Sequence, residues 1–257
     1  MRLYRRVAGL ATVTALSLGA AACGVAEAAI DAAAAATPAG KLLAAAPDQA
    51  TPAFAFATKG DCSGSISGVV DPAAKAARAS ATAKVPGVGA VTMSYLLIGE
   101  DKSFFSIAFK PASLHAANGV PKGWHKVDPA KVGEESREML VYSPEILDPL
   151  GVGGLASVAS GVVQDGAKYT GTIDMTRIEQ AKRILPATTM TKLGDRAKAV
   201  PFEAIVDEAT GTTTSFTLSP PDAKSCTAVY DKFGAVKKVS APKAKKATAA
   251  LYRLLGA

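Results

Sequence analysis

Short apolar runs separated by brief polar turns recur along most of this chain, and this pattern limits its possible folds more than any other feature. In residues 53–60, Phe54 and Phe56 alternate with smaller residues and fall on one face of a strand. Residues 64–70 follow after a short glycine-containing turn, which predicts a hairpin. Turns of this length join antiparallel neighbours, because a parallel crossover needs a dozen residues or more.

Further strands are predicted in the same way, and few helices separate them. The predicted strands cover residues 91–98, 103–109, 123–128, 167–176, 199–208, 212–220, 225–234 and 235–242, the last two as a hairpin-like pair. Short helices are predicted over residues 39–48, 177–185 and 246–257. Because no regular alternation of strand and helix appears, the fold class is α+β with a dominant antiparallel sheet.

The middle of the chain, residues 143–163, has a different pattern. Ser143 is suited to an N-cap and Pro144 to the first helical position. Apolar residues then recur at roughly helical spacing, and glycines interrupt them at 151, 153 and 154. We therefore expect two short helical pieces that are hinged at these glycines.

The first 22 residues have the features of a secretory signal peptide. A short head with three arginines precedes an uncharged apolar stretch, and small residues fill its end. Ala20, Ala21 and Ala22 lead directly into Cys23, which resembles the bacterial lipobox. We expect lipidation of Cys23, with the protein anchored on the extracytoplasmic face of the cell membrane. The alternative is an ordinary secreted protein in which Cys23 is incidental.

The remaining chain is expected to hold a tether and one domain. Residues 23–50 are rich in alanine and interrupted by proline, as in a tether, and residues 51–257 are expected to form a single domain. The formal net charge is +7, and removal of the three arginines of the signal leaves 7 − 3 = +4. Without a basic stripe interleaved with aromatic residues, nucleic-acid binding is disfavoured. The basic run 237–246 is interpreted as a solvated surface, with contact to anionic headgroups or wall polymers as the alternative.

Three cysteines cannot all pair within one chain. If Cys23 is acylated, Cys62 and Cys226 remain as an even pair that can oxidise outside the cytoplasm. A disulfide between them is therefore predicted. Two separate thiols are the alternative, because the sequence does not show how closely the two residues approach.

From residue 53 onward the chain resembles the actinobacterial lipoproteins of the LppX/LprAFG type. The resemblance rests on the order of the segments GWHKVD, YTGTIDMT, VPFEAIVDE and VYDKFGAVKKVSAP, with an apolar helical segment after the first. It implies a LolA-like fold, a curved antiparallel half-barrel with helices covering its concave face. The cysteine pair at 62 and 226 departs from the family pattern, and so does the proline-broken N-terminal helix.

The resemblance also implies a function, the carriage of lipids or glycolipids outside the cytoplasmic membrane. The covering segment and the sheet would then supply the apolar wall of an acyl-chain cavity: Phe54, Phe56, Phe104, Phe105, Ile146, Leu147, Leu150, Val152, Leu155 and Val158. The alternative is that these side chains form an ordinary core. A second functional hypothesis is an envelope sensor or interaction module that regulates a protein partner through the same fold.

Catalytic and metal-binding patterns do not support an enzyme. The segment GDCSG at 60–64 has the spelling of a nucleophile elbow, but a predicted strand follows where a helix is required. His115 and His125 lack neighbouring residues at zinc-ligand spacing. We therefore expect no catalytic residue, no metal and no cofactor.

Overall fold

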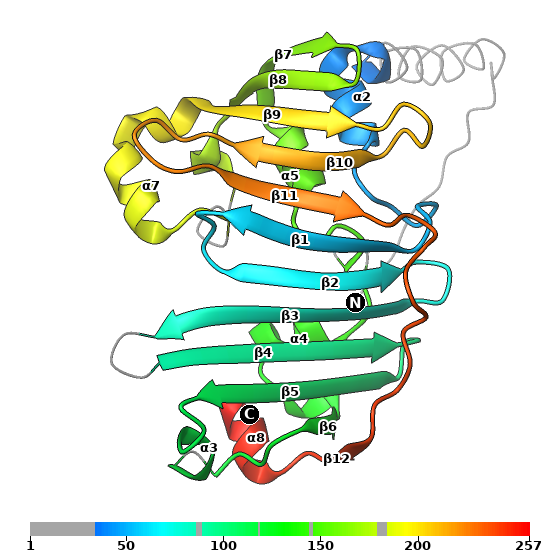
Figure 1. The fold of residues 1–257 in the computed structure, drawn as a ribbon, viewed down its shortest axis with the longest axis vertical. Helices are drawn as coiled ribbons and strands as arrows, with labels where there is room; N and C mark the ends of the chain where they lie inside the picture. The colour runs from blue at the N-terminus through cyan, green and yellow to red at the C-terminus, as the bar shows by residue number, and fades with distance from the viewer. Residues whose placement is uncertain (1–33, 86–88, 118, 144–145, 179–183) are drawn as a thin grey trace, which may run out of the picture.

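The computed structural model describes residues 34–257 except 86–88, 118, 144–145 and 179–183. Its central feature is a sheet of twelve strands in the order β12-β6-β5-β4-β3-β2-β1-β11-β10-β9-β8-β7 (Figure 1). Every pair of neighbours is antiparallel except β12 and β6, which are parallel. The strands are β1 (Phe54–Gly60), β2 (Ser65–Asp71), β3 (Ala76–Val85), β4 (Gly89–Ile98), β5 (Lys102–Lys110), β6 (Trp124–Val127), β7 (Ala159–Asp165), β8 (Lys168–Ile173), β9 (Val200–Val206), β10 (Thr213–Leu218), β11 (Cys226–Asp231) and β12 (Ala244–Lys246).

Two runs of sequential hairpins meet in the middle of this sheet. β1 to β6 form one half in chain order, and β7 to β11 form the other. The junction is the pairing of β1 with β11, which sets Phe56 opposite Tyr230 and Gly60 opposite Cys226. The first and last parts of the domain are therefore hydrogen-bonded neighbours.

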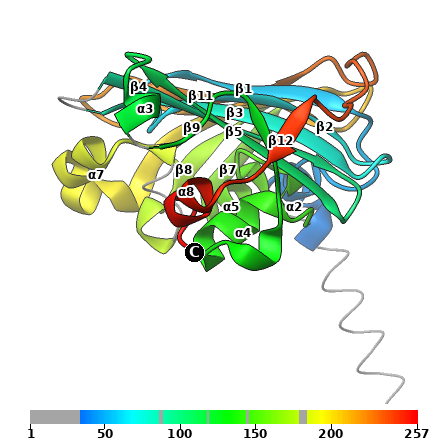
Figure 2. The ribbon, with the colours of Figure 1, turned by 90° about the horizontal axis from the view of Figure 1, so that it is seen from below.

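The sheet curls around a set of short helices that lie on one of its faces (Figure 2). The helices of the described residues are α2 (Pro38–Ala44), α3 (Leu114–Ala117), α4 (Glu134–Leu140), α5 (Val152–Ser157), α7 (Ala187–Leu193) and α8 (Ala249–Leu254), with 3-10 turns at Pro129–Lys131, Met175–Arg177 and Gly194–Ala199. Thr37 caps α2 by accepting from the Gly40 amide, and Thr248 caps α8 by accepting from the Leu251 amide. We call this face the helix side and the opposite one the outer face.

Apolar side chains form two cores on the helix side and a small cluster on the outer face. The larger core joins α2, α5 and the strands on both sides of the β1–β11 junction. The smaller one lies between β5, β6, α4 and α8, and Tyr95 packs against both. On the outer face, Ala76, Leu96, Phe104 and Val239 form the third cluster.

The α+β class, the curved antiparallel sheet and the helices on its inner face are confirmed. β1 and β2 pair as predicted, and so do β4 with β5 and β9 with β10. The helices predicted near the two ends of the domain correspond to α2 and α8. Residues 179–183 of the helix predicted over 177–185 lie outside the described residues.

Besides α3, α4, α7 and β12, which were not predicted, three features of the fold differ from the sequence-based prediction. β3 was not predicted, because its sequence AARASATAKV presents only alanines to the core, at Ala77 and Ala79. Residues 159–163, predicted as helix, form β7, where Gly161 takes a positive φ of 59° beside a register shift. Residues 235–242 do not pair with β11, because β1 and β10 already occupy both of its edges.

Candidate functional site

The predicted disulfide is present and lies where the two halves of the sheet meet. Cys62 follows β1 and Cys226 begins β11, and the two Cα atoms are 4.9 Å apart. The Ser63 hydroxyl donates to the Leu185 carbonyl at 2.7 Å, and the Ser63 amide donates to Ile184. The disulfide turn therefore also holds the segment that leads into α7.

Most of the side chains predicted to form an apolar wall come together in the larger core. Phe54 and Phe56 reach it from β1, where their alternation points both to the helix side. From the covering segment come Ile146, Leu147, Leu150, Val152 and Leu155, all buried, with Val158 partly buried against them. These side chains fill the space between the sheet and α5. Whether they line a ligand site stays a prediction.

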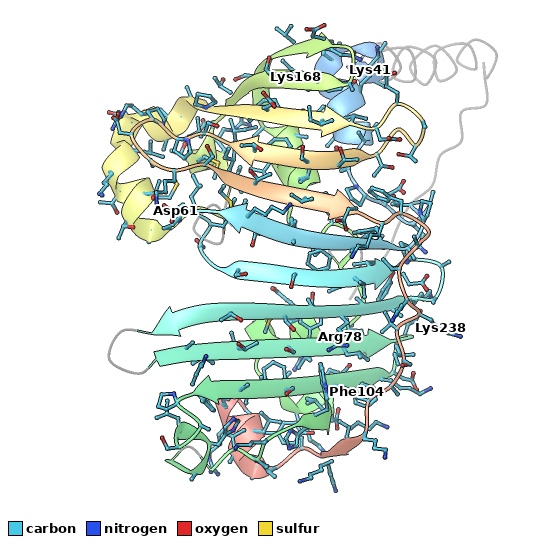
Figure 3. All side chains as sticks on the ribbon, viewed as in Figure 1. Lys41, Asp61, Arg78, Phe104, Lys168 and Lys238 are labelled. Atoms are coloured by element: carbon cyan, nitrogen blue, oxygen red, sulfur yellow. A yellow bond between two sulfur atoms is a disulfide. The ribbon has the colours of Figure 1, made fainter. Side chains whose placement is uncertain are left out.

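Phe104 does not belong to this group, which corrects its predicted place. It packs with Ala76, Leu96 and Val239 on the outer face (Figure 3). Its neighbour Phe105 points to the helix side and joins the smaller core. Successive residues of a strand point to opposite faces, so only one of the two phenylalanines can face the helices.

A carboxylate lies among these apolar side chains. The Asp148 Oδ1 atom accepts a hydrogen bond from the Tyr230 hydroxyl at 2.5 Å, and its Oδ2 atom accepts from the Gly153 amide at 2.6 Å. Tyr230 is on β11 and only 1% exposed. The pair therefore ties the start of α5 directly to the central strand of the sheet.

Burial changes the ionisation of both partners in this contact. It raises the pKa of Asp148, and the hydrogen bonds from Tyr230 and from backbone amides oppose that rise. Burial and the neighbouring carboxylate together raise the pKa of Tyr230 well above its usual range. Tyr95, which packs between the two cores, has its pKa raised by burial to about 12.

Of the three glycines predicted to form a hinge, Gly151 lies between Asp148 and α5, and Gly153 and Gly154 lie within α5. Gly151 takes φ +69° and ψ +29°, a left-handed conformation that glycine adopts at little cost. A Cβ atom at Gly151 or Gly154 would meet no heavy atom within 4 Å, whereas one at Gly153 would lie 3.3 Å from Asp148. Backbone geometry therefore favours glycine at 151, and a Cβ atom at 153 would require the Asp148 or Ala46 side chain to shift by a few tenths of an ångström.

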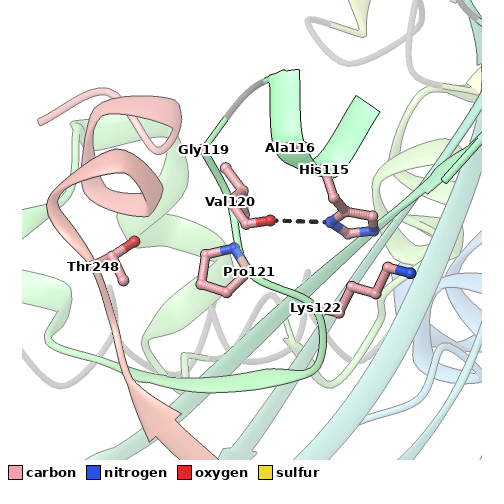
Figure 4. Close-up of a pocket in the computed structure, with 7 residues that line it drawn as sticks. All are labelled: His115, Ala116, Gly119, Val120, Pro121, Lys122 and Thr248. Carbon is pink, nitrogen blue, oxygen red and sulfur yellow. Dashed lines mark hydrogen bonds between the residues drawn. The ribbon is translucent and has the colours of Figure 1, made fainter. Parts of the chain in front are cut away.

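Two surface pockets lie away from this core, at the β6 end of the molecule. The first, of about 360 Å³, is lined by His115, Val120, Lys122 and Thr248 among others (Figure 4). The His115 Nδ1 atom is 3.1 Å from the Val120 carbonyl, and its Nε2 atom accepts from the Phe109 amide at 3.3 Å. Both ring nitrogens thus contact backbone groups, so this histidine holds Phe109 and Val120 together across the loop that contains it.

The second histidine is enclosed by the protein. His125 is 1% exposed and lies opposite Phe105 in the sheet. Burial lowers its pKa, and the positive charge of Lys245 lowers it further. Among the described residues, no group of three or more histidine, cysteine, aspartate or glutamate side chains is placed to hold a metal ion.

The sequence analysis did not identify Asp148 or Tyr230. The available signal was a single acid between Leu147 and Pro149 in an otherwise apolar segment, which burial makes costly without a partner. The partner lies 82 residues away along the chain and could not be found from spacing.

Within the residues that the structure describes, no helix has the length and apolar character needed to cross a membrane. No protein-family profile and no curated protein sequence matches the chain. Among solved structures, the crystal structure of the lipoprotein LppX of Mycobacterium tuberculosis is similar to it. The two share 14% sequence identity over 83% of this chain and 100% of that one, with a TM-score of 0.36. Because both the TM-score and the sequence identity are low, the function has to be argued from the residues of the chain itself.

Proposed function

We propose that this chain is an extracytoplasmic lipoprotein, anchored to the membrane through Cys23, that binds the acyl chain of a lipid or glycolipid as a carrier or chaperone. The ligand would enter between the sheet and α5. The observation that carries this proposal is the way α5 is held: a six-residue helix on a glycine hinge, fixed by the contact of Asp148 with Tyr230.

In the described state the wall side chains pack against one another, so binding requires α5 and its hinge to move. Exposing a buried aliphatic side chain costs about 1.5–3 kcal/mol, and burying one methylene group returns about 0.8 kcal/mol. About ten buried methylenes would therefore offset the exposure of three to five side chains such as Val152 and Leu155. An acyl chain of common length is long enough to replace the displaced contacts.

Native mass spectrometry of the mature chain, followed by solvent extraction and lipid analysis, tests this proposal. We expect an additional mass that extracts as phospholipid or glycolipid. Tyr230→Phe, which frees the hinge, should raise the occupied fraction after incubation with lipid extract. Tyr169→Phe is the matched control, since Tyr169 lies in the same core. A ligand-free mass for all three proteins after incubation would contradict the proposal.

A second candidate function, an interaction module for a protein partner, is favoured by exposed apolar side chains next to the helical cover. Met139, Val141 and Leu254 are 39%, 37% and 47% exposed. The Gly133 amide, just before α4, donates to the Leu255 carbonyl at 2.9 Å, which holds the ends of α4 and α8 together. If lipid binding fails, crosslinking from position 254 in intact cells would test for a partner at this surface.

A further inference from the structure

The segment that follows β11 and ends with β12, residues 232–246, is the most basic part of the chain. It contains six lysines and neither aspartate nor glutamate: Lys232, Lys237, Lys238, Lys243, Lys245 and Lys246. The formal net charge of the whole chain is +7, so all other residues together contribute 7 − 6 = +1. We call this segment the strap. Like charges in one segment repel, so their placement here opposes folding.

The strap lies against the outer face of the sheet and is fixed there. It passes the ends of β1 to β5 on its way to β12 (Figure 1). Val239, at its centre, is buried against Ala76, Leu96 and Phe104, while Lys237 and Lys238 beside it stay exposed. At its end, β12 pairs in parallel with β6. The strap is therefore held to the sheet at Val239 and at β12.

The sheet adds cations to the same face. Four residues line up across the neighbouring strands β3 to β6. Leu96 pairs with Arg78 on one side and with Phe104 on the other, and Phe104 pairs with Lys126. Lys126 in turn lies beside Lys246. Residues directly opposite each other share a face of the sheet. The resulting basic face consists of Arg78, Lys126 and Lys246 on the strands, with the exposed Lys237 and Lys238 of the strap beside them, and Figure 3 labels Arg78 and Lys238.

Acidic side chains of the protein do not neutralise this face. Within the described part of the chain, none of its five cations forms an ion pair. Nearby, Glu100 pairs with Lys75, and the Asp71 carboxylate accepts from the Ala74 amide. Asp231 directly precedes the strap. The cations are thus available to an anionic partner.

Trp124, the only tryptophan, lies within the basic face. It is half-buried against the outer cluster, and the Arg78 guanidinium lies 5.7 Å from its ring centroid. Tryptophan favours the boundary between lipid and water. Cations spread over an open sheet face suit a broad array of anions rather than one small ligand.

We propose that the basic face docks the domain onto a membrane surface that contains anionic phospholipid. The inference goes beyond the proposed function, because it concerns the face opposite the helices and does not depend on a cargo. In the docked orientation the helical cover faces away from the membrane. The hinge at Gly151 and the exposed side chains of α4 and α8 are then free to move or to meet a partner.

Fluorescence of Trp124 tests this directly in the full chain. The protein is reconstituted at equal density into vesicles of phosphatidylcholine, with or without phosphatidylglycerol, each containing brominated lipid as a contact quencher. We expect quenching only in the anionic vesicles and its loss in 1 M NaCl, where the screening length is about 3 Å. The double variant Lys237→Gln, Lys238→Gln should lower the ratio of docked to undocked protein about 30-fold, at about 1 kcal/mol per lysine.

The matched control is Lys192→Gln, Lys224→Gln, which removes the same charge from exposed positions elsewhere and should leave the quenching unchanged. Equal quenching in neutral and anionic vesicles would overturn the proposal, as would equal loss in both double variants. If soluble polyphosphate displaces the face from vesicles at equal phosphate concentration, the partner is an anionic polymer instead, and the membrane proposal is wrong. None of these outcomes depends on whether the protein carries lipid, which mass spectrometry measures separately.

Discussion

Replacement of Tyr230 by phenylalanine should destabilise this protein more at neutral pH than at acid pH. The change deletes one hydroxyl, 2.5 Å from the Asp148 carboxylate, and leaves the aromatic packing in place. A hydrogen bond to a charged group contributes about 1.5–3 kcal/mol, and one between neutral groups about 0.5–1.5 kcal/mol. We therefore expect a loss of about 2–3 kcal/mol where Asp148 is ionised and about 1 kcal/mol where it is protonated.

The sign of the pH effect follows from the pKa of Asp148. Burial raises this pKa in the folded state above its unfolded value, so the folded state binds the proton more tightly. The contribution of Asp148 to stability is therefore greatest at acid pH and declines as pH rises through the folded pKa. The Tyr230 hydroxyl limits that decline, and the phenylalanine variant should show a steeper one.

Urea unfolding of both proteins at a series of pH values measures this difference. Tyr169→Phe is the control: Tyr169 is also buried in the larger core, but its hydroxyl makes no hydrogen bond within the described residues. Tyr169→Phe should lower the free energy of unfolding by the same amount at every pH. A loss for Tyr230→Phe that is below 0.5 kcal/mol or independent of pH would show that the hydroxyl does not stabilise an ionised carboxylate.

Three other predictions follow from the fold. Replacing Cys62 and Cys226 by alanine should lower the free energy of unfolding by about 5 kcal/mol in the chain-entropy model, given their separation of 164 residues, and an unchanged denaturation midpoint would argue against the cross-link. The pKa of His125 is lowered from 6.5, so stability should fall as pH drops below 6.5, and His125→Phe should remove that part of the pH dependence in urea titrations. Gly151→Ala should cost about 1 kcal/mol in thermal unfolding because of its positive φ, whereas Gly154→Ala should cost less or stabilise α5.

Local patterns were sufficient for most strands of the antiparallel sheet. Alternation in β1 predicted that Phe54 and Phe56 share one face, and short polar turns predicted the hairpins of β1 with β2 and of β4 with β5. These features depend on residues that are close in sequence, so they can be predicted from the sequence of this chain alone. The odd number of cysteines similarly led to the pairing of Cys62 with Cys226.

Where local signals were weak or balanced, the prediction failed. β3 presents alanines to the core, and its burial comes from pairing with β2 and β4 rather than from its own apolar pattern. Phe104 and Phe105 are equally apolar, and only their register against β6 decides which faces the helices. Residues 235–242 resemble a strand in sequence. Because β1 and β10 already pair with the two edges of β11, these residues continue along the outer face instead.

The sequence by itself determined most of the strands, several hairpins, the cysteine pair and the concentration of lysines near the end of the chain. Only the tertiary structure decided what meets across the β1–β11 junction, where Tyr230 reaches Asp148 from 82 residues away. It also decided that Lys126 and Lys246 share a face with Arg78 and Trp124. The physical reason is that side-chain periodicity is a local property, whereas the partner of a partly buried carboxylate or a surface charge depends on which strand edges remain free to pair.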